Sequence, residues 1–117
     1  MKPRELLDMA INFAKREPKW RGDMLMAAVS VRSDGLFVAS RNVQVQAQRT
    51  PEGHAERRLS SKLRKGAVVA VARVTRDGEI AKAKPCKGCE TLLRNRRVSV
   101  IFYTDPDEPE GFGTVIL

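Results

Sequence analysis

The feature that most constrains the fold is residues 67–74, a run of alanine and valine in which Arg73 is the only charged residue. A strand with one face in water would alternate apolar and polar residues, and this segment does not. It is too uniform for an edge strand. We therefore expect it to be the central strand of a sheet that is covered on both faces.

The segments on either side of this strand alternate between helical and strand patterns. Apolar residues recur at helical spacing in three segments, and short apolar runs bounded by turn residues separate them. The expected helices are residues 3–16, a segment from Glu52 or Gly53 to about 63, and 85–95. The expected strands are residues 24–31, 36–40, 67–74, 98–103 and 114–117.

Helices that lie between consecutive strands predict an α/β fold, a three-layer α-β-α sandwich around a mixed central sheet. The length suits a single domain spanning residues 1–117. The last connection, residues 105–113, is shorter than the roughly a dozen residues that a parallel crossover requires. We therefore expect the last strand to run antiparallel to the strand before it.

The chain carries a formal net charge of +8 at pH 7. A basic balance favours a polyanionic partner or a phosphorylated substrate, and it is also compatible with solubility alone. Lys and Arg cluster within 57–65 and 94–97, which reads either as phosphate binding or as a solvated face with charges suited to a helix C-terminus. The sequence has no run of about 18 apolar residues and no signal-peptide pattern, so we expect a cytoplasmic protein without a membrane partner.

The two cysteines, Cys86 and Cys89, form a C-x-x-C motif that suits a disulfide, a redox pair or a metal site. A thioredoxin-like redox pair would follow the first strand, and this motif lies late in the chain. Residues at i and i+3 share one helical face, and the partial positive charge of a helix N-terminus favours thiolate. The spacing therefore fits two metal ligands in the first turn of the helix at 85–95.

His54 is the only histidine of the chain, and it stands at the expected start of the preceding helix. One His and two Cys suit Zn²⁺, and three protein ligands leave a fourth position for water, as in catalytic zinc sites. Glu56 could then accept a proton from water, whose pKa zinc lowers toward about 7. Two alternatives stay open: a surface histidine beside two buried cysteines, and a structural zinc site completed by a carboxylate.

Taken together, His54-Ala55-Glu56 and Pro85-Cys86-Lys87-Gly88-Cys89 resemble the signature of the zinc-dependent cytidine/deoxycytidylate deaminase superfamily. The resemblance covers residues 24–103 and implies the cytidine deaminase-like fold. It implies that His54, Cys86 and Cys89 bind Zn²⁺ and that Glu56 is the catalytic proton shuttle. The implied reaction converts the cytosine of cytidine, deoxycytidine or their nucleotides to uracil and releases ammonia.

The resemblance also implies residues that contact the substrate. Asn42 stands where relatives contact the sugar, and the main chain near Lys84 would contact the exocyclic amine. The other implied substrate contacts are Ala55, Pro85 and Tyr103. Relatives are often homo-oligomers, so a homo-oligomer is expected here as well.

Two departures from the free-nucleoside members of the superfamily leave the substrate open. Free-nucleoside deaminases usually have a third Cys at the position of His54 and an Arg at the position of Glu90. The histidine and the net charge favour an alternative, a deaminase of cytosine or adenine in single-stranded DNA, RNA or tRNA. Against it, the acidic side chains within residues 105–110 would repel a long polyanion.

Overall fold

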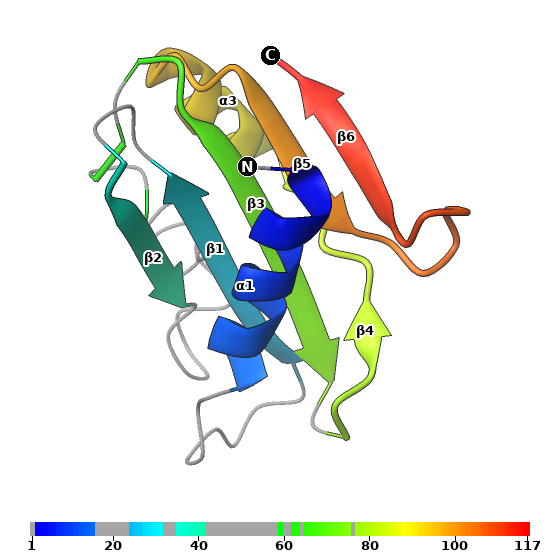
Figure 1. Cartoon of the computed structure of the whole chain (residues 1–117). Helices are drawn as coiled ribbons and strands as arrows, with labels where there is room; N and C mark the ends of the chain where they lie inside the picture. The colour runs from blue at the N-terminus through cyan, green and yellow to red at the C-terminus, as the bar shows by residue number, and fades with distance from the viewer. Residues whose placement is uncertain are drawn as a thin grey trace.

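A computed structural model gives the structure of residues 2–15, 24–31, 35–41, 59, 62–63, 65–75 and 77–117. In chain order the elements are α1 (Pro3–Lys15), β1 (Met24–Val31), β2 (Phe37–Arg41), β3 (Val68–Thr75), β4 (Ile80–Ala81), α3 (Lys87–Asn95), β5 (Val100–Thr104) and β6 (Phe112–Ile116). Within these residues, six strands form one sheet in the order β2-β1-β3-β5-β6, with β4 paired to β3 (Figure 1). None of the helices in this part of the chain has the length and apolarity needed to cross a membrane.

The apolar segment at residues 67–74 is the centre of the sheet. Strand β3 pairs with β1 along its whole length, from Val68 opposite Val31 to Thr75 opposite Met24. On its other side β3 runs parallel to β5, whereas the remaining strand pairs are antiparallel. The predicted central strand, the mixed sheet and the antiparallel last strand are all confirmed.

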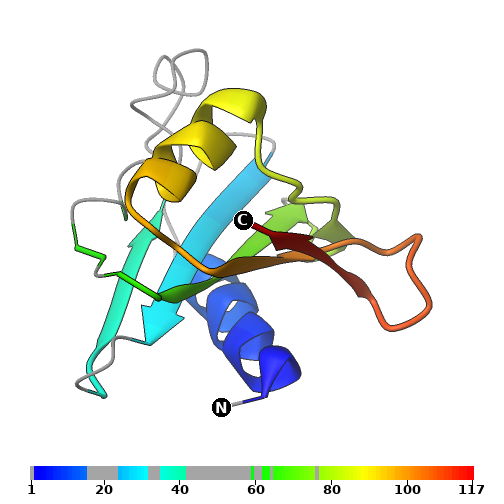
Figure 2. The same ribbon diagram turned by 90° about the horizontal axis from the view of Figure 1, so that it is seen from above.

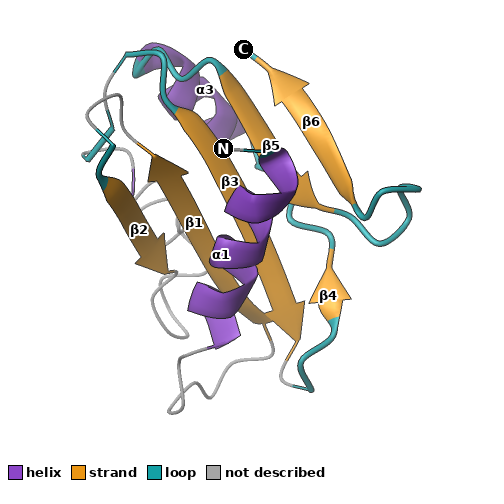
Figure 3. Cartoon of the chain, viewed as in Figure 1, coloured by secondary structure: helices purple, strands orange, loops and turns teal. Residues whose placement is uncertain are grey.

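Apolar side chains on the two faces of the sheet pack against different helices. On one face, Leu6, Leu7 and Ala10 of α1 pack against β1 and β3. On the other face, Leu93 of α3 and Leu59 pack in a cluster with residues of β1, β3 and β5. The helices therefore lie on opposite sides of the sheet, as Figures 2 and 3 show, and the predicted three-layer sandwich is confirmed.

The structure differs from the sequence expectations mainly at the ends of elements. Residues 80–81, where no strand was predicted, form β4 and pair with Arg73 and Val74. A two-residue strand is too short to produce a recognisable alternation, which explains why the pattern did not predict it. The helix predicted to open at Pro85 begins at Lys87 with Cys86 as its N-cap. The last two strands also begin two residues away from the predicted positions.

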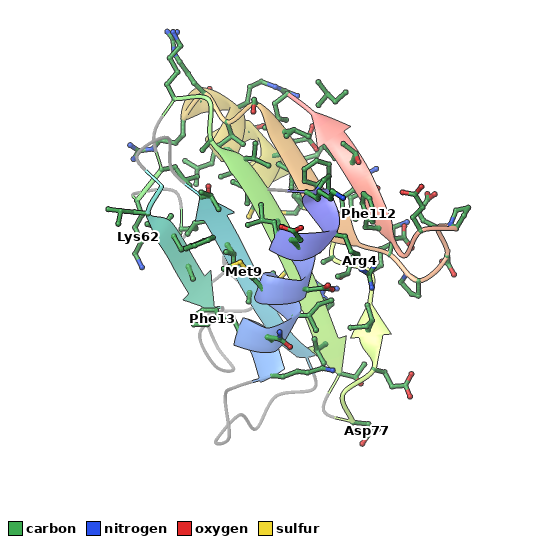
Figure 4. The ribbon with its side chains drawn as sticks, in the orientation of Figure 1. Arg4, Met9, Phe13, Lys62, Asp77 and Phe112 are labelled. Atoms are coloured by element: carbon green, nitrogen blue, oxygen red, sulfur yellow. The ribbon has the colours of Figure 1, made fainter. Side chains whose placement is uncertain are left out.

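Most of the segment predicted as the second helix lies outside the described residues. Leu59 is in a helical conformation and fully buried, and Leu63 packs against the same core cluster, so both side chains face the core. Lys62 donates from Nζ to the main-chain oxygen of Ala39 in β2 at 3.0 Å, and Figure 4 shows its side chain beside that strand. Gly66, which follows this segment, has a positive φ of 82°, a conformation that glycine adopts without strain.

Candidate functional site

The two cysteines lie at the N-terminus of α3. Cys86 is the N-cap with extended backbone (φ −69°, ψ 164°), and its Sγ accepts a hydrogen bond from the Cys89 main-chain N–H at 3.4 Å. Cys86 is exposed, Cys89 is buried, and neither is in a disulfide. The sulfur of Cys86 therefore takes the place of the oxygen acceptor that usually caps a helix N-terminus.

The segment that leads into α3 is anchored to the carboxyl end of β5. The main-chain N–H of Ala83 donates to the carbonyl oxygen of Thr104 at 2.8 Å. Strands β3 and β5 are parallel, so their carboxyl ends meet at one edge of the sheet, where ligand sites of α/β folds commonly form. The two cysteines therefore lie a few residues after the point where the chain is bound to this edge.

The side chain of Thr104 forms a junction between three strands. It is 2% exposed. Its Oγ1 donates to the carbonyl oxygen of Ala81 in β4 at 2.7 Å and accepts from the main-chain N–H of Arg73 in β3 at 3.2 Å. At this point the partner of β3 changes from β5 to β4, and the hydroxyl replaces the main-chain groups that would otherwise continue the ladder. Thr104 is not among the site residues that the sequence singles out, because a hydroxyl at a strand end is too common to be a signal.

The next residue, Asp105, is also buried, with 2% of its surface exposed. Its Oδ1 accepts the main-chain N–H of Asp107 at 3.0 Å, and its Oδ2 lies 3.6 Å from Nζ of Lys82. The ion pair joins the start of the acidic loop to the segment that leads to Cys86. Asp105 is therefore a fixed part of this edge, whereas residues 106–110 of the same loop are exposed.

The other described candidate residues differ in exposure. Lys84 is exposed and Pro85 is buried, immediately before the N-cap. Tyr103 is 8% exposed and belongs to the core cluster on the α3 side of the sheet. Its ring lies so close to Gly113 of β6 that a Cβ at this position would overlap it. The structure thus places Tyr103 on the same face as α3, mostly within the core.

Four of the predicted site residues, Asn42, His54, Ala55 and Glu56, lie outside the described residues. Within the described part of the chain, no three His, Cys, Asp or Glu side chains gather as a metal site. The two described donors fit a zinc site in their chemistry, because both are sulfur ligands and share one helix N-terminus. The space around Gly88, between them, is open: Sγ of Cys86 is the nearest atom to a Cβ built there, at 4.0 Å.

Two surface cavities of the described residues lie on the α1 side of the sheet. The larger, about 200 Å³, is lined by Met9, Asn12 and Phe13 of α1 with Val29, Phe37 and Ala39; Figure 4 labels Met9 and Phe13 on the helix. The smaller, about 140 Å³, lies between the start of α1, where Arg4 is, and the β5–β6 loop. None of the predicted site residues lines either cavity.

The fold is shared with solved structures of cytidine deaminases. The cytidine deaminase from Burkholderia pseudomallei superposes with a TM-score of 0.72 over 99% of this chain and 93% of its own, at 18% identity. The enzyme from Mycobacterium tuberculosis superposes with a TM-score of 0.60 over 96% of this chain and 89% of its own, at 21% identity. The enzyme from Mycobacterium leprae superposes with a TM-score of 0.59 over 97% of this chain and 93% of its own, at 18% identity. The chain has the cytidine deaminase fold.

Comparison of the sequence alone gives a different result. No protein-family model matches the chain, and no curated protein matches it. At identities of 18–21% the solved structures establish how the chain folds, and a shared fold alone does not establish what a protein does.

Proposed function

We propose that the protein is a zinc-dependent hydrolytic deaminase that converts a cytosine base in a nucleoside or nucleotide to uracil. The observation that carries the proposal is the position of Cys86 and Cys89. They open α3 directly after the carboxyl edge of the parallel strands β3 and β5, in a fold shared with cytidine deaminases. A cytoplasmic location, where thiols stay reduced, is consistent with this use of the cysteines.

In this proposal the ligands of zinc are His54, Cys86 and Cys89. Bound zinc supplies Lewis-acid chemistry, which makes water acidic enough to react at neutral pH. The helix N-terminus stabilises negative charge on both sulfurs. The hydrogen bond from the Cys89 N–H to Sγ of Cys86 orients the exposed sulfur.

The carboxylate of Glu56 is proposed to accept a proton from water and deliver it to the base. Oxygen from water then replaces the exocyclic amino group, which leaves as ammonia. The main-chain carbonyl of Lys84 is proposed to accept a hydrogen bond from that amino group. The Ala83–Thr104 hydrogen bond would hold this carbonyl in position, because it anchors the adjacent residue to β5. Asn42, Ala55, Pro85 and Tyr103 complete the proposed substrate contacts.

The proposal is tested by measuring metal content and products together. Purified protein is expected to hold one zinc per chain, and mass spectrometry is expected to detect uracil products from cytidine, deoxycytidine or their monophosphates. Glu56→Ala is expected to keep zinc and lose turnover, whereas Cys86→Ser is expected to lose zinc. Glu90→Ala is a matched control on the same helix, since Glu90 pairs with Arg94 at 3.2 Å and is not a proposed ligand. Full turnover in Glu56→Ala, or zinc well below one per chain in careful preparations, would overturn the proposal.

A second candidate, a deaminase acting on nucleic acid, is favoured by the charges around Cys86. Lys82, Lys84 and Lys87 are all exposed within four residues of it. Such cations suit a phosphate in the substrate, whether in a mononucleotide or in a strand. Including single-stranded DNA and RNA in the product screen distinguishes the two candidates.

A further inference from the structure

A cluster of basic side chains lies at the end of α3 that is opposite the cysteines. This basic end consists of Lys65, Arg94, Arg96 and Arg97, all of which are exposed. The N–H of Gly66 donates to the carbonyl oxygen of Arg97 at 2.8 Å, and Ser99 Oγ donates to the carbonyl oxygen of Gly66 at 3.3 Å. These bonds hold the turn before β3 against the end of α3, so the main chain brings Lys65 and Arg97 together. Figure 1 shows the start of β3 and α3 at the same end of the molecule.

Within the described part of the chain, little of this positive charge is neutralised. Arg94 forms an ion pair with Glu90 at 3.2 Å, with the two side chains 57% and 27% exposed. Among the residues that the structure describes, Lys65, Arg96 and Arg97 take part in no ion pair. Three exposed cations therefore remain available to an anionic partner.

Arg97 has a backbone conformation that is unusual for a residue with a side chain. Its φ is 61°, in the left-handed region, and it follows the C-cap residue Arg96. Glycine is the usual residue at this position, because a side chain there is strained. The helix dipole explains basic residues at Arg94 and Arg96, but it does not require an arginine where glycine would fit better. The arginine at this position therefore carries a conformational cost that the helix dipole does not explain.

The acidic loop does not cancel the basic end. The loop begins at Asp105, at the carboxyl end of β5, whereas the basic end lies before the amino end of the same strand. The five residues of β5 span about 16 Å. This is twice the screening length of about 8 Å at physiological ionic strength. The repulsion expected from residues 105–110 is therefore weak at the basic end.

We propose that the basic end binds the phosphate backbone of nucleic acid. Three of its four cations are arginines, whose planar guanidinium groups match phosphate oxygens in pairs. The proposal adds a partner to the proposed deaminase and does not depend on turnover, so it is tested by binding alone.

The experiment compares two double variants of the full-length chain. Arg96→Ala/Arg97→Gly removes two cations from the basic end, and Lys2→Ala/Lys15→Ala removes two exposed cations from the ends of α1. Binding of a fluorescein-labelled single-stranded oligonucleotide is measured by anisotropy from 50 to 200 mM salt. Each phosphate contact contributes roughly 0.7 to the slope of log affinity against log salt. In the basic-end variant the magnitude of this slope is therefore expected to fall by about 1.4, and the affinity at 50 mM salt is expected to fall at least tenfold. The α1 variant is expected to keep the slope and the affinity of the unsubstituted protein.

A single substitution separates binding from folding. Arg97→Gly is expected to raise Tm by about 4 °C, because glycine relieves the left-handed strain, and to weaken oligonucleotide binding at the same time. Equal salt slopes for the two double variants would overturn the proposal. So would equally potent competition by polyglutamate at the same charge concentration, since this would show that phosphate is not recognised.

Discussion

The Thr104 hydroxyl is the contact most suited to a quantitative test. Thr104→Val replaces it with a methyl group of nearly the same shape, so no cavity is created and packing is retained. Two partners lose their hydrogen bonds: the carbonyl oxygen of Ala81 and the main-chain N–H of Arg73. The substitution therefore isolates the polar contribution of the junction between β3, β4 and β5.

The magnitude follows from the burial of these partners. A buried polar group left without a partner costs about 1–3 kcal/mol. Both hydrogen bonds are only partly shielded from water, so the lower half of the range applies to each. Thr104→Val is therefore expected to lower the free energy of unfolding by about 2–4 kcal/mol for the two hydrogen bonds together. For a chain of 117 residues this corresponds to a fall in Tm of roughly 8–16 °C.

The assay is urea unfolding at fixed pH, with the m-value as a check that the same surface is exposed. Thr114→Val is the matched control, because it makes the same chemical change at an exposed position of β6. This control is expected to change the free energy of unfolding by less than about 0.5 kcal/mol. Thr104→Ser, which keeps the hydroxyl, is expected to recover most of the loss. If Thr104→Val unfolds at the same urea concentration as the unsubstituted protein, the reasoning about the junction is wrong.

Three further substitutions test the packing around the site by urea unfolding. Gly113→Ala would push a methyl group into the buried Tyr103 ring, and overpacking of this kind costs about 1–3 kcal/mol; an unchanged midpoint would contradict the contact. Leu93→Ala removes a fully buried side chain of α3 and is expected to cost about 2–5 kcal/mol. Its control, Leu92→Ala, should cost less, because Leu92 is only partly buried. Glu90→Ala breaks an exposed ion pair and is expected to cost below about 1 kcal/mol.

Local patterns were enough to predict the architecture. The apolar run at 67–74 predicted the central strand, because only a strand covered on both faces can be apolar at nearly every position. The short last connection predicted an antiparallel β6, because chain length alone rules out a parallel crossover. The C-x-x-C spacing placed Cys86 and Cys89 together at the start of a helix, since i, i+3 spacing is a property of the helix itself.

The tertiary structure alone decided how the carboxyl edge of the sheet is held together. Thr104 meets Arg73 across 31 residues and Ala81 across 23, and no local periodicity relates these positions. The burial of Asp105 beside Lys82 has the same origin. Sequence patterns specify which face of an element is apolar, but hydrogen bonds between distant segments form only after the chain has brought those segments together.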